Sequence, residues 1–147
     1  MSSSKIPFRK QMEFEYAEVQ QITPMIRRVV ARNPSNFTFH GTNTYIIGHG
    51  NVAVIDPGPM IEEHLGALIS ALKDDTVEHI LVTHTHNDHS PGVVPLKEKI
   101  GGQIWGAHPR EIPSQQQTSE SIDWNFSPDH VLRDGTQIAS DEWTIET

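Results

Sequence analysis

The sequence contains no cysteine, so the chain can form no disulfide and offers no thiolate to a metal ion. Stable disulfides are typical of exported proteins, and a chain without them is compatible with the cytoplasmic location that we expect. No apolar run is long enough to span a bilayer, and the segment Met1–Pro7 has no apolar core of a secretory signal. We therefore expect a soluble, intracellular protein with no membrane partner.

Basic residues are also scarce. Eleven lysines and arginines stand against nineteen aspartates and glutamates, which gives a net charge of −8. Surfaces that bind nucleic-acid phosphates need clustered lysine and arginine, so a nucleic-acid partner is disfavoured. An anionic small-molecule substrate is still compatible, because a bound metal ion would be the largest local charge in its site. The length of 147 residues fits one domain with a real core.

The pattern of apolar residues predicts a mixed α/β fold. Residues 1–20 are polar and are expected to form a flexible segment, and a hairpin is expected from residues 37–47 and 52–55. The order strand, helix, strand then implies parallel pairing. We expect helices starting at Pro59 and at Pro91, the latter capped by Ser90, strands at 26–30, 79–83 and 103–107, an exposed loop over 108–127 and a last hairpin from 137–138 and 143–145.

One short stretch concentrates the chemistry of the chain. His84, His86, Asp88 and His89 fall within six residues, directly after the apolar run Ile80–Val82. Loops beyond the carboxyl ends of parallel strands are where such sheets bind ligands, and imidazole and carboxylate groups suit zinc, with iron or manganese as alternatives. In an extended backbone the first two histidines would point the same way. One cation could then take that pair and a second cation the other pair.

Asp56 also follows an apolar strand, Val52–Ile55. It is therefore expected at the same edge of the sheet, where its carboxylate could orient the histidine loop as a supporting contact. A turn aspartate before Pro-Gly is the alternative interpretation. His108 ends the next strand, and we interpret it as an ordinary loop residue. His64 and His79 receive no role beyond solvation or hydrogen bonding, and Trp105 and Trp143 are interpreted as core residues. No substrate-binding residue can be named.

These residues resemble the metallo-β-lactamase superfamily. Its His-x-His-x-Asp-His signature is met at 84–89, and Val54–Gly58 resembles its earlier aspartate motif. Residues 37–48 look like the branch with glyoxalase II-type thioesterases and β-lactamase-like protein 2. The resemblance implies an αββα sandwich, of which residues 21–147 would be the N-terminal portion, with a mixed sheet and helices on its outer face.

The resemblance also implies roles for the loop residues. His84 and His86 would bind one zinc, Asp88 and His89 a second, and Asp88 would help to orient a bridging hydroxide and transfer a proton. The family's remaining ligands come from motifs further along, and Thr144–Thr147 resembles the strand that leads into the first of them. We therefore expect a fragment of a longer enzyme, a short product that binds metal weakly, or a chain completed by a partner, either the missing C-terminal half or a second copy.

The function predicted at this stage is metal-dependent hydrolysis of a small-molecule thioester or ester. Hydrolysis of single-stranded RNA by the same fold is one alternative. The other is a non-catalytic fragment that holds a metal ion and cleaves nothing.

Overall fold

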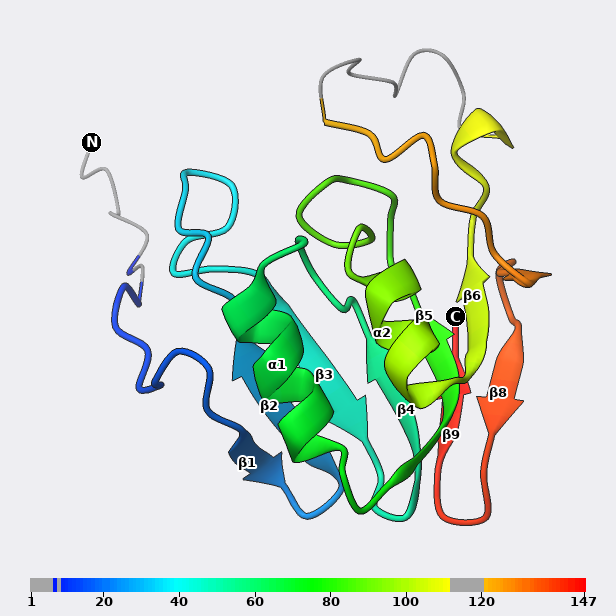
Figure 1. The fold of residues 1–147 in the computed structure, drawn as a ribbon, viewed down its shortest axis with the longest axis horizontal. Helices are drawn as coiled ribbons and strands as arrows, with labels where there is room; N and C mark the ends of the chain where they lie inside the picture. The colour runs from blue at the N-terminus through cyan, green and yellow to red at the C-terminus, as the bar shows by residue number, and fades with distance from the viewer. Residues whose placement is uncertain (1–6, 8, 112–120) are drawn as a thin grey trace, which may run out of the picture.

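In a computed structural model that describes residues 7, 9–111 and 121–147, the chain forms one large sheet with a helical layer on one face (Figure 1). Within those residues the large sheet has seven strands in the order β1-β2-β3-β4-β5-β6-β7, and β8 and β9 make a separate two-stranded sheet. The predicted class, a mixed α/β sheet with helices on its outer face, is confirmed. None of the helices among the described residues has the length and apolar character needed to cross a membrane.

The first four strands are antiparallel and the next three are parallel. β1 (Gln20–Thr23), β2 (Ile26–Val30), β3 (Asn43–Ile47) and β4 (Asn51–Ile55) pair in sequence order. β5 (Thr76–Leu81), β6 (Gln103–Gly106) and β7 (His130–Val131) then add in parallel to β4. Helices α1 (Glu62–Ala71) and α2 (Val93–Ile100) connect β4 to β5 and β5 to β6, as the predicted order of elements requires. A 3-10 turn (Pro109–Glu111), β8 (Gln137–Ala139) and β9 (Thr144–Glu146) complete the described elements.

The alternation of side chains along β4 builds two apolar layers, one on each face of the sheet. Val52 and Val54 belong to the cluster that packs under α1 and α2, where Leu68 and Leu96 are fully buried. Ala53, between the two valines, belongs instead to the cluster formed with the β8–β9 hairpin, whose members include Leu81, Ile138 and Trp143. The parallel strands β4 and β5 are thus fixed from both sides, and their carboxyl ends are held in register.

The first predicted hairpin is shorter than expected. Residues 45–47 pair with β4 and residues 43–47 with β2, but residues 37–42 leave the sheet and form a loop. Asn33 explains the difference, because its side-chain amide oxygen accepts the Thr42 N–H and its backbone carbonyl accepts the Thr38 hydroxyl. Gly41 has a φ of 148°, and a Cβ there would lie 1.8 Å from the Ala31 carbonyl oxygen. Local bonding therefore overrides the strand propensity of this segment.

Both helices begin two to three residues later than predicted. α1 starts at Glu62 and not at Pro59, and α2 starts at Val93 after Gly92. Ser90 does not cap α2, because its hydroxyl donates to Asp123 Oδ2 at 2.7 Å. α2 ends at Ile100, and Gly101 follows at a φ of 77° with its N–H donating to the Lys97 carbonyl.

The described residues of the predicted loop over 108–127 are partly buried. Ile122 and Phe126 are 5% and 4% exposed, which was not expected of an exposed loop. The glutamine run at 115–117 lies outside the described residues. Trp143 is in the core as predicted, and Trp105 packs against the same cluster while its indole N–H donates to His79 Nδ1 at 3.0 Å.

His64 interrupts the apolar stripe of α1 and is 2% exposed. Its Nε2 lies 2.8 Å from the Thr44 hydroxyl, so the histidine is hydrogen-bonded and not solvated. Burial lowers the pKa of His64 from 6.5 to about 4, against smaller opposing effects of the Pro57 carbonyl and Glu63. The ring is therefore neutral in the folded chain at neutral pH.

This burial predicts a specific acid sensitivity. The unfolded chain binds a proton at this site near pH 6.5, whereas the folded chain does so only near pH 4. The free energy of unfolding should therefore fall by about 3 kcal/mol as the pH drops through that window. Urea unfolding at a series of pH values should show a shallower fall for His64→Gln and no change for the exposed control His49→Gln. An unchanged slope in His64→Gln would contradict the assignment.

Candidate metal centre

The carboxyl ends of β4 and β5 bring Asp56 and the histidine loop together. Because the strands are parallel neighbours, the residue that follows β4 lies beside those that follow β5. The Asp56 N–H donates to the Leu81 carbonyl at 2.8 Å, which continues the pairing one step beyond β4. Thr83 and His84 come next after β5, at the same edge of the sheet.

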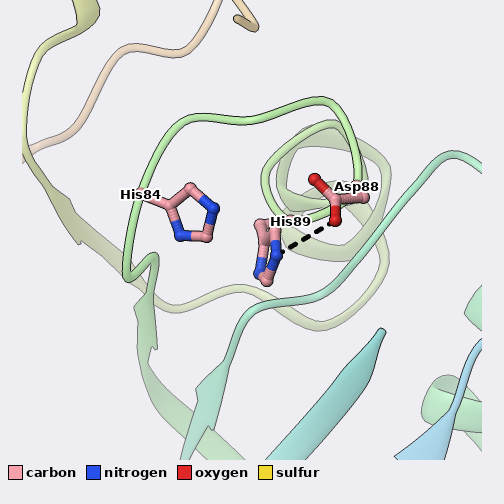
Figure 2. A group of neighbouring side chains, drawn as sticks. All are labelled: His84, Asp88 and His89. Carbon is pink, nitrogen blue, oxygen red and sulfur yellow. Dashed lines mark ion pairs between the residues drawn. The ribbon is translucent and has the colours of Figure 1, made fainter. Parts of the chain in front are cut away.

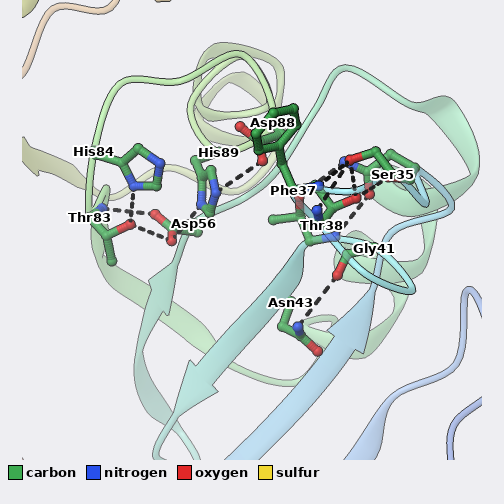
Figure 3. Close-up of polar contacts among 12 residues, drawn as sticks. Ser35, Phe37, Thr38, Gly41, Asn43, Asp56, Thr83, His84, Asp88 and His89 are labelled. Carbon is green, nitrogen blue, oxygen red and sulfur yellow. Dashed lines mark hydrogen bonds and ion pairs between the residues drawn. The ribbon is translucent and has the colours of Figure 1, made fainter. Parts of the chain in front are cut away.

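Asp56 is the hub of the contacts at this edge (Figure 3). Its side chain is 8% exposed, and its Oδ1 accepts the Thr83 N–H at 2.8 Å. Oδ2 accepts the Thr83 hydroxyl at 2.7 Å and lies 2.9 Å from His89 Nδ1. The residue has a φ of 51°, a left-handed conformation that aspartate tolerates better than most side chains. Its carboxylate therefore fixes the ring of His89 with Nδ1 as the donor, which directs Nε2 away from Asp56.

Three side chains of the loop converge on a shared volume (Figure 2). Each of His84, Asp88 and His89 offers a ligand atom, and these atoms all lie within 4.8 Å of one another. His89 Nε2 is 3.2 Å from Asp88 Oδ2. Bonds of 2.0–2.1 Å in tetrahedral geometry separate neighbouring ligand atoms by roughly 3.3 Å, so this pair has the spacing of two ligands on one zinc ion.

His86 lies beside this group and is not part of it. Its ring centroid is 4.6 Å from that of His84, but its atoms are not among the three that converge. The His86 backbone forms an isolated bridge with Ile122, and the chain turns directly after it, where the His86 carbonyl accepts the His89 N–H at 2.9 Å. The assignment of the four predicted ligands to two cations stays a prediction.

The segment 121–123 braces the loop from outside. The Asn87 N–H donates to the Ser121 carbonyl at 2.8 Å, and the Asp123 N–H donates to the Thr85 carbonyl at 2.7 Å. The Asp123 carboxylate also accepts the Ser90 hydroxyl. These contacts were not predicted, because a polar segment with no periodicity gives no indication of what it pairs with.

The pKa values of His84 and His89 are shifted in opposite directions. Burial lowers the pKa of His84, and the neighbouring His89 and His86 lower it further, so the ring is held neutral as a metal ligand must be. For His89, burial opposes the charged form, but the hydrogen bond and charge of Asp56, together with Asp88, raise the pKa.

The donor set fits a catalytic zinc site. Two imidazole nitrogens and one carboxylate are zinc ligands, and three protein ligands leave a position for water or substrate. Iron and manganese accept the same donors. His108 is not in the converging group, and its Nδ1 accepts the Arg110 N–H at 3.2 Å, in line with its interpretation as a loop residue.

The Ser35–Asn43 loop is drawn beside the centre in Figure 3. In this loop Phe37 is 97% exposed, and Phe39 is 51% exposed. Both residues were predicted to lie in a strand, and the loop instead presents their aromatic side chains to solvent.

The fold and the site together define a class of protein. Residues 37–146 match the family model of the metallo-β-lactamase superfamily, and the chain belongs to that superfamily. The predicted resemblance is thus confirmed at the level of the superfamily.

Curated relatives match part of the chain. The atrochrysone carboxyl ACP thioesterase dmxR1 of Cryptosporiopsis sp. (strain 8999) is 38% identical over 103 residues, which is 68% of this chain and 32% of that protein. A β-lactamase-like protein 2 homolog of Caenorhabditis elegans is 29% identical over 132 residues, 87% of this chain and 42% of that protein. The chain therefore spans less than half the length of these relatives.

Solved structures show the same fold. A metallo-β-lactamase of Cronobacter sakazakii, a HARLDQ motif mutant, superposes with a TM-score of 0.66 at 19% identity, over 86% of this chain and 52% of that one. BJP-1, a subclass B3 metallo-β-lactamase of Bradyrhizobium japonicum, gives a TM-score of 0.63 at 18% identity, over 88% and 50%.

Removing the hub carboxylate should destabilise the metal-free chain. Asp56→Ala leaves the Thr83 N–H and the His89 ring N–H without their acceptor, and it places alanine at a positive φ, so we expect a loss of about 2–4 kcal/mol. Asp56→Asn, which tolerates this φ and keeps one acceptor oxygen, should lose less. Urea unfolding of both variants would measure this, with the exposed Asp134→Ala as control. A loss in Asp56→Ala no larger than in the control would contradict the role of the hub.

Proposed function

We propose that this chain is the metal-binding part of a hydrolase that cleaves a small-molecule thioester or ester. The observation that carries the proposal is the convergence of His84, Asp88 and His89 within 4.8 Å at the carboxyl edge of a parallel sheet. The relatives named as ACP thioesterases support the thioester class. The chain covers only about a third of dmxR1, so the activity is proposed for the full-length protein.

Each residue of the centre has a proposed task. His84 and His89 would hold the ion through ring nitrogens and Asp88 through a carboxylate oxygen, while His86 would hold a second ion if two are bound. Bound zinc lowers the pKa of a coordinated water toward neutrality and polarises a substrate carbonyl. Asp56 keeps Nδ1 of His89 protonated, so that Nε2 is the nitrogen left to bind.

Asp88 is the proposed catalytic residue. Its Oδ2 lies beside His89, and its other oxygen accepts no hydrogen bond from the described part of the chain. The side chain is 29% exposed, so a water molecule can reach it. This free oxygen can orient the attacking water and take its proton, which general-base catalysis requires.

The composition and an apolar cavity bear on the proposed location and partner of the chain. The cysteine-free composition supports a cytoplasmic location, which stays a prediction. A cavity of about 440 Å³ opens between β5 and the β8–β9 hairpin, with Ile55, Leu81, Leu132 and Ile145 in its lining. Such an apolar surface fits the predicted partner, either the remaining half of the domain or a second copy.

Metal binding tests the site directly. In the full-length protein, His84→Ala and His89→Ala should weaken zinc binding by more than the 10–100-fold typical of a lost supporting contact, because each removes a ligand. His86→Ala should do so only if two ions are bound. Zinc content by elemental analysis and affinity by competition titration would measure this, with His49→Ala as the control. Stoichiometric zinc in His84→Ala or His89→Ala would contradict the site.

Hydrolysis tests the reaction. The zinc-loaded protein should cleave acyl thioesters in preference to single-stranded RNA, and Asp88→Asn should lower kcat by about 10²–10⁴-fold, the contribution typical of a general base. Zinc content measured on the same sample separates loss of metal from loss of the base. Cleavage of RNA without cleavage of thioesters would favour the alternative substrate. Full zinc occupancy with neither activity would favour the non-catalytic fragment.

A further inference from the structure

Asp56 aims its carboxylate correctly only because its backbone is held in an unusual conformation. Its φ is 51°, and both of its backbone polar groups are bonded. The N–H donates to the Leu81 carbonyl, and the carbonyl oxygen accepts the Thr44 hydroxyl at 2.6 Å. The first bond belongs to the sheet. The second comes from a side chain that neither the predicted nor the proposed function uses.

The Thr44 hydroxyl has one proton and two polar neighbours. It is fully buried, so no solvent can exchange with it. The Asp56 carbonyl can only accept, so the hydroxyl proton must go there. The hydroxyl must then accept from its other neighbour, His64 Nε2, at 2.8 Å. The geometry thus fixes the direction of donation from His64 Nε2–H to Thr44 and from Thr44 to Asp56.

His64 touches the centre by a second route. A Cβ built on Gly58 would lie 3.2 Å from His64 Nε2, so the ring lies directly beneath that glycine. The Gly58 N–H donates to the His89 carbonyl at 2.9 Å. The turn Asp56–Gly58 therefore holds His89 at two points, its ring through the Asp56 carboxylate and its backbone through Gly58, and this turn rests on His64.

We propose that His64 and Thr44 are positioning residues for the metal centre, acting through the backbone of Asp56 and Gly58 to set the orientation of His89. This proposal rests on the proposed function in that the centre must bind a metal ion. His64 comes from α1, on the helical side of the sheet, so the helix layer would contribute directly to ligand geometry. Neither His64 nor Thr44 would contact the ion.

The first test uses the unaltered protein without metal. Long-range ¹H–¹⁵N NMR of the histidine rings should show His64 as the neutral tautomer with its proton on Nε2, and His89 protonated at Nδ1. A His64 proton on Nδ1 would overturn the proposed direction of donation. This test does not depend on metal binding, so it stays decisive even if the protein binds no zinc.

The second test removes the hydroxyl. Thr44→Val keeps the shape of the side chain but cannot donate to Asp56, and zinc affinity should fall by about 10–100-fold, the size of effect expected when the support of a ligand is lost. In the metal-free variant the His89 ring should lose its fixed Nδ1–H form. Thr44→Ser, which restores the hydroxyl, should return zinc affinity to within about threefold of the unaltered protein.

A matched control separates positioning from general stability. Thr42 is also a buried threonine just before β3, 4% exposed, and its hydroxyl accepts from Asn33 and not from His64. Thr42→Val should therefore lower stability but leave zinc affinity and the His89 ring unchanged. A folded Thr44→Val protein whose zinc affinity and His89 signals match those of Thr42→Val would overturn the proposal.

Two variants of His64 test the proposal independently in case Thr44→Val does not fold. His64→Gln can still donate through its amide and should keep most of the zinc affinity, whereas His64→Leu fills the space without a donor and should lose it. Equal zinc affinity in the two variants would overturn the role of His64. Absence of zinc binding in the unaltered protein would instead overturn the proposed function. The tautomer of His64 would still test the direction of the hydrogen bonds from His64 to Thr44 and from Thr44 to Asp56.

Discussion

The carboxylate of Asp56 is the constraint on which the rest of the site depends. It accepts hydrogen bonds from Thr83 and holds the ring of His89, so it joins the end of β4 to the loop that follows β5. Without that connection, the loop would be tied to β4 mainly by the backbone bond from Gly58 to His89. The carboxylate is buried, and a buried charge is tolerated only when it is fully paired. The same pairing that satisfies the buried Asp56 carboxylate also fixes the orientation of the His89 ring.

The sheet gives this interaction its precision. β4 and β5 are parallel neighbours with apolar layers on both faces, from the helices on one side and from the β8–β9 hairpin on the other. A functional group set on such a rigid base moves little, which is what a metal centre requires of its ligands. The loop itself is irregular, and its shape is maintained by bonds to the turn after β4 and to the segment 121–123.

The proximity of the histidine loop and Asp56 could be predicted from the sequence, because each follows an apolar strand and the order of elements implied parallel pairing. The strand–helix–strand order could be predicted from the pattern of apolar residues. Thr44 and His64 could not be assigned a function, since one appears as an ordinary strand residue and the other as a polar interruption of a helix. Their proposed role depends on hydrogen bonds between residues far apart in the sequence, since Thr44 is 12 residues from Asp56 and 20 from His64. Local hydrogen bonds also explain two wrong boundaries. Asn33 binds Thr38 and Thr42, so β3 starts later than predicted, and the Ser90 hydroxyl donates to Asp123 and so does not cap α2.

The central claim is that three side chains of one loop share a single cation, with His89 directed by Asp56. Anomalous diffraction at the zinc edge from crystals of the zinc-loaded protein tests it most directly. The account predicts an anomalous peak about 2.0–2.2 Å from Nε2 of His89, a carboxylate oxygen of Asp88 and a ring nitrogen of His84, with Asp56 still bonded to Nδ1 of His89. A peak bound elsewhere, or one that lacks His89 among its ligands, would contradict it.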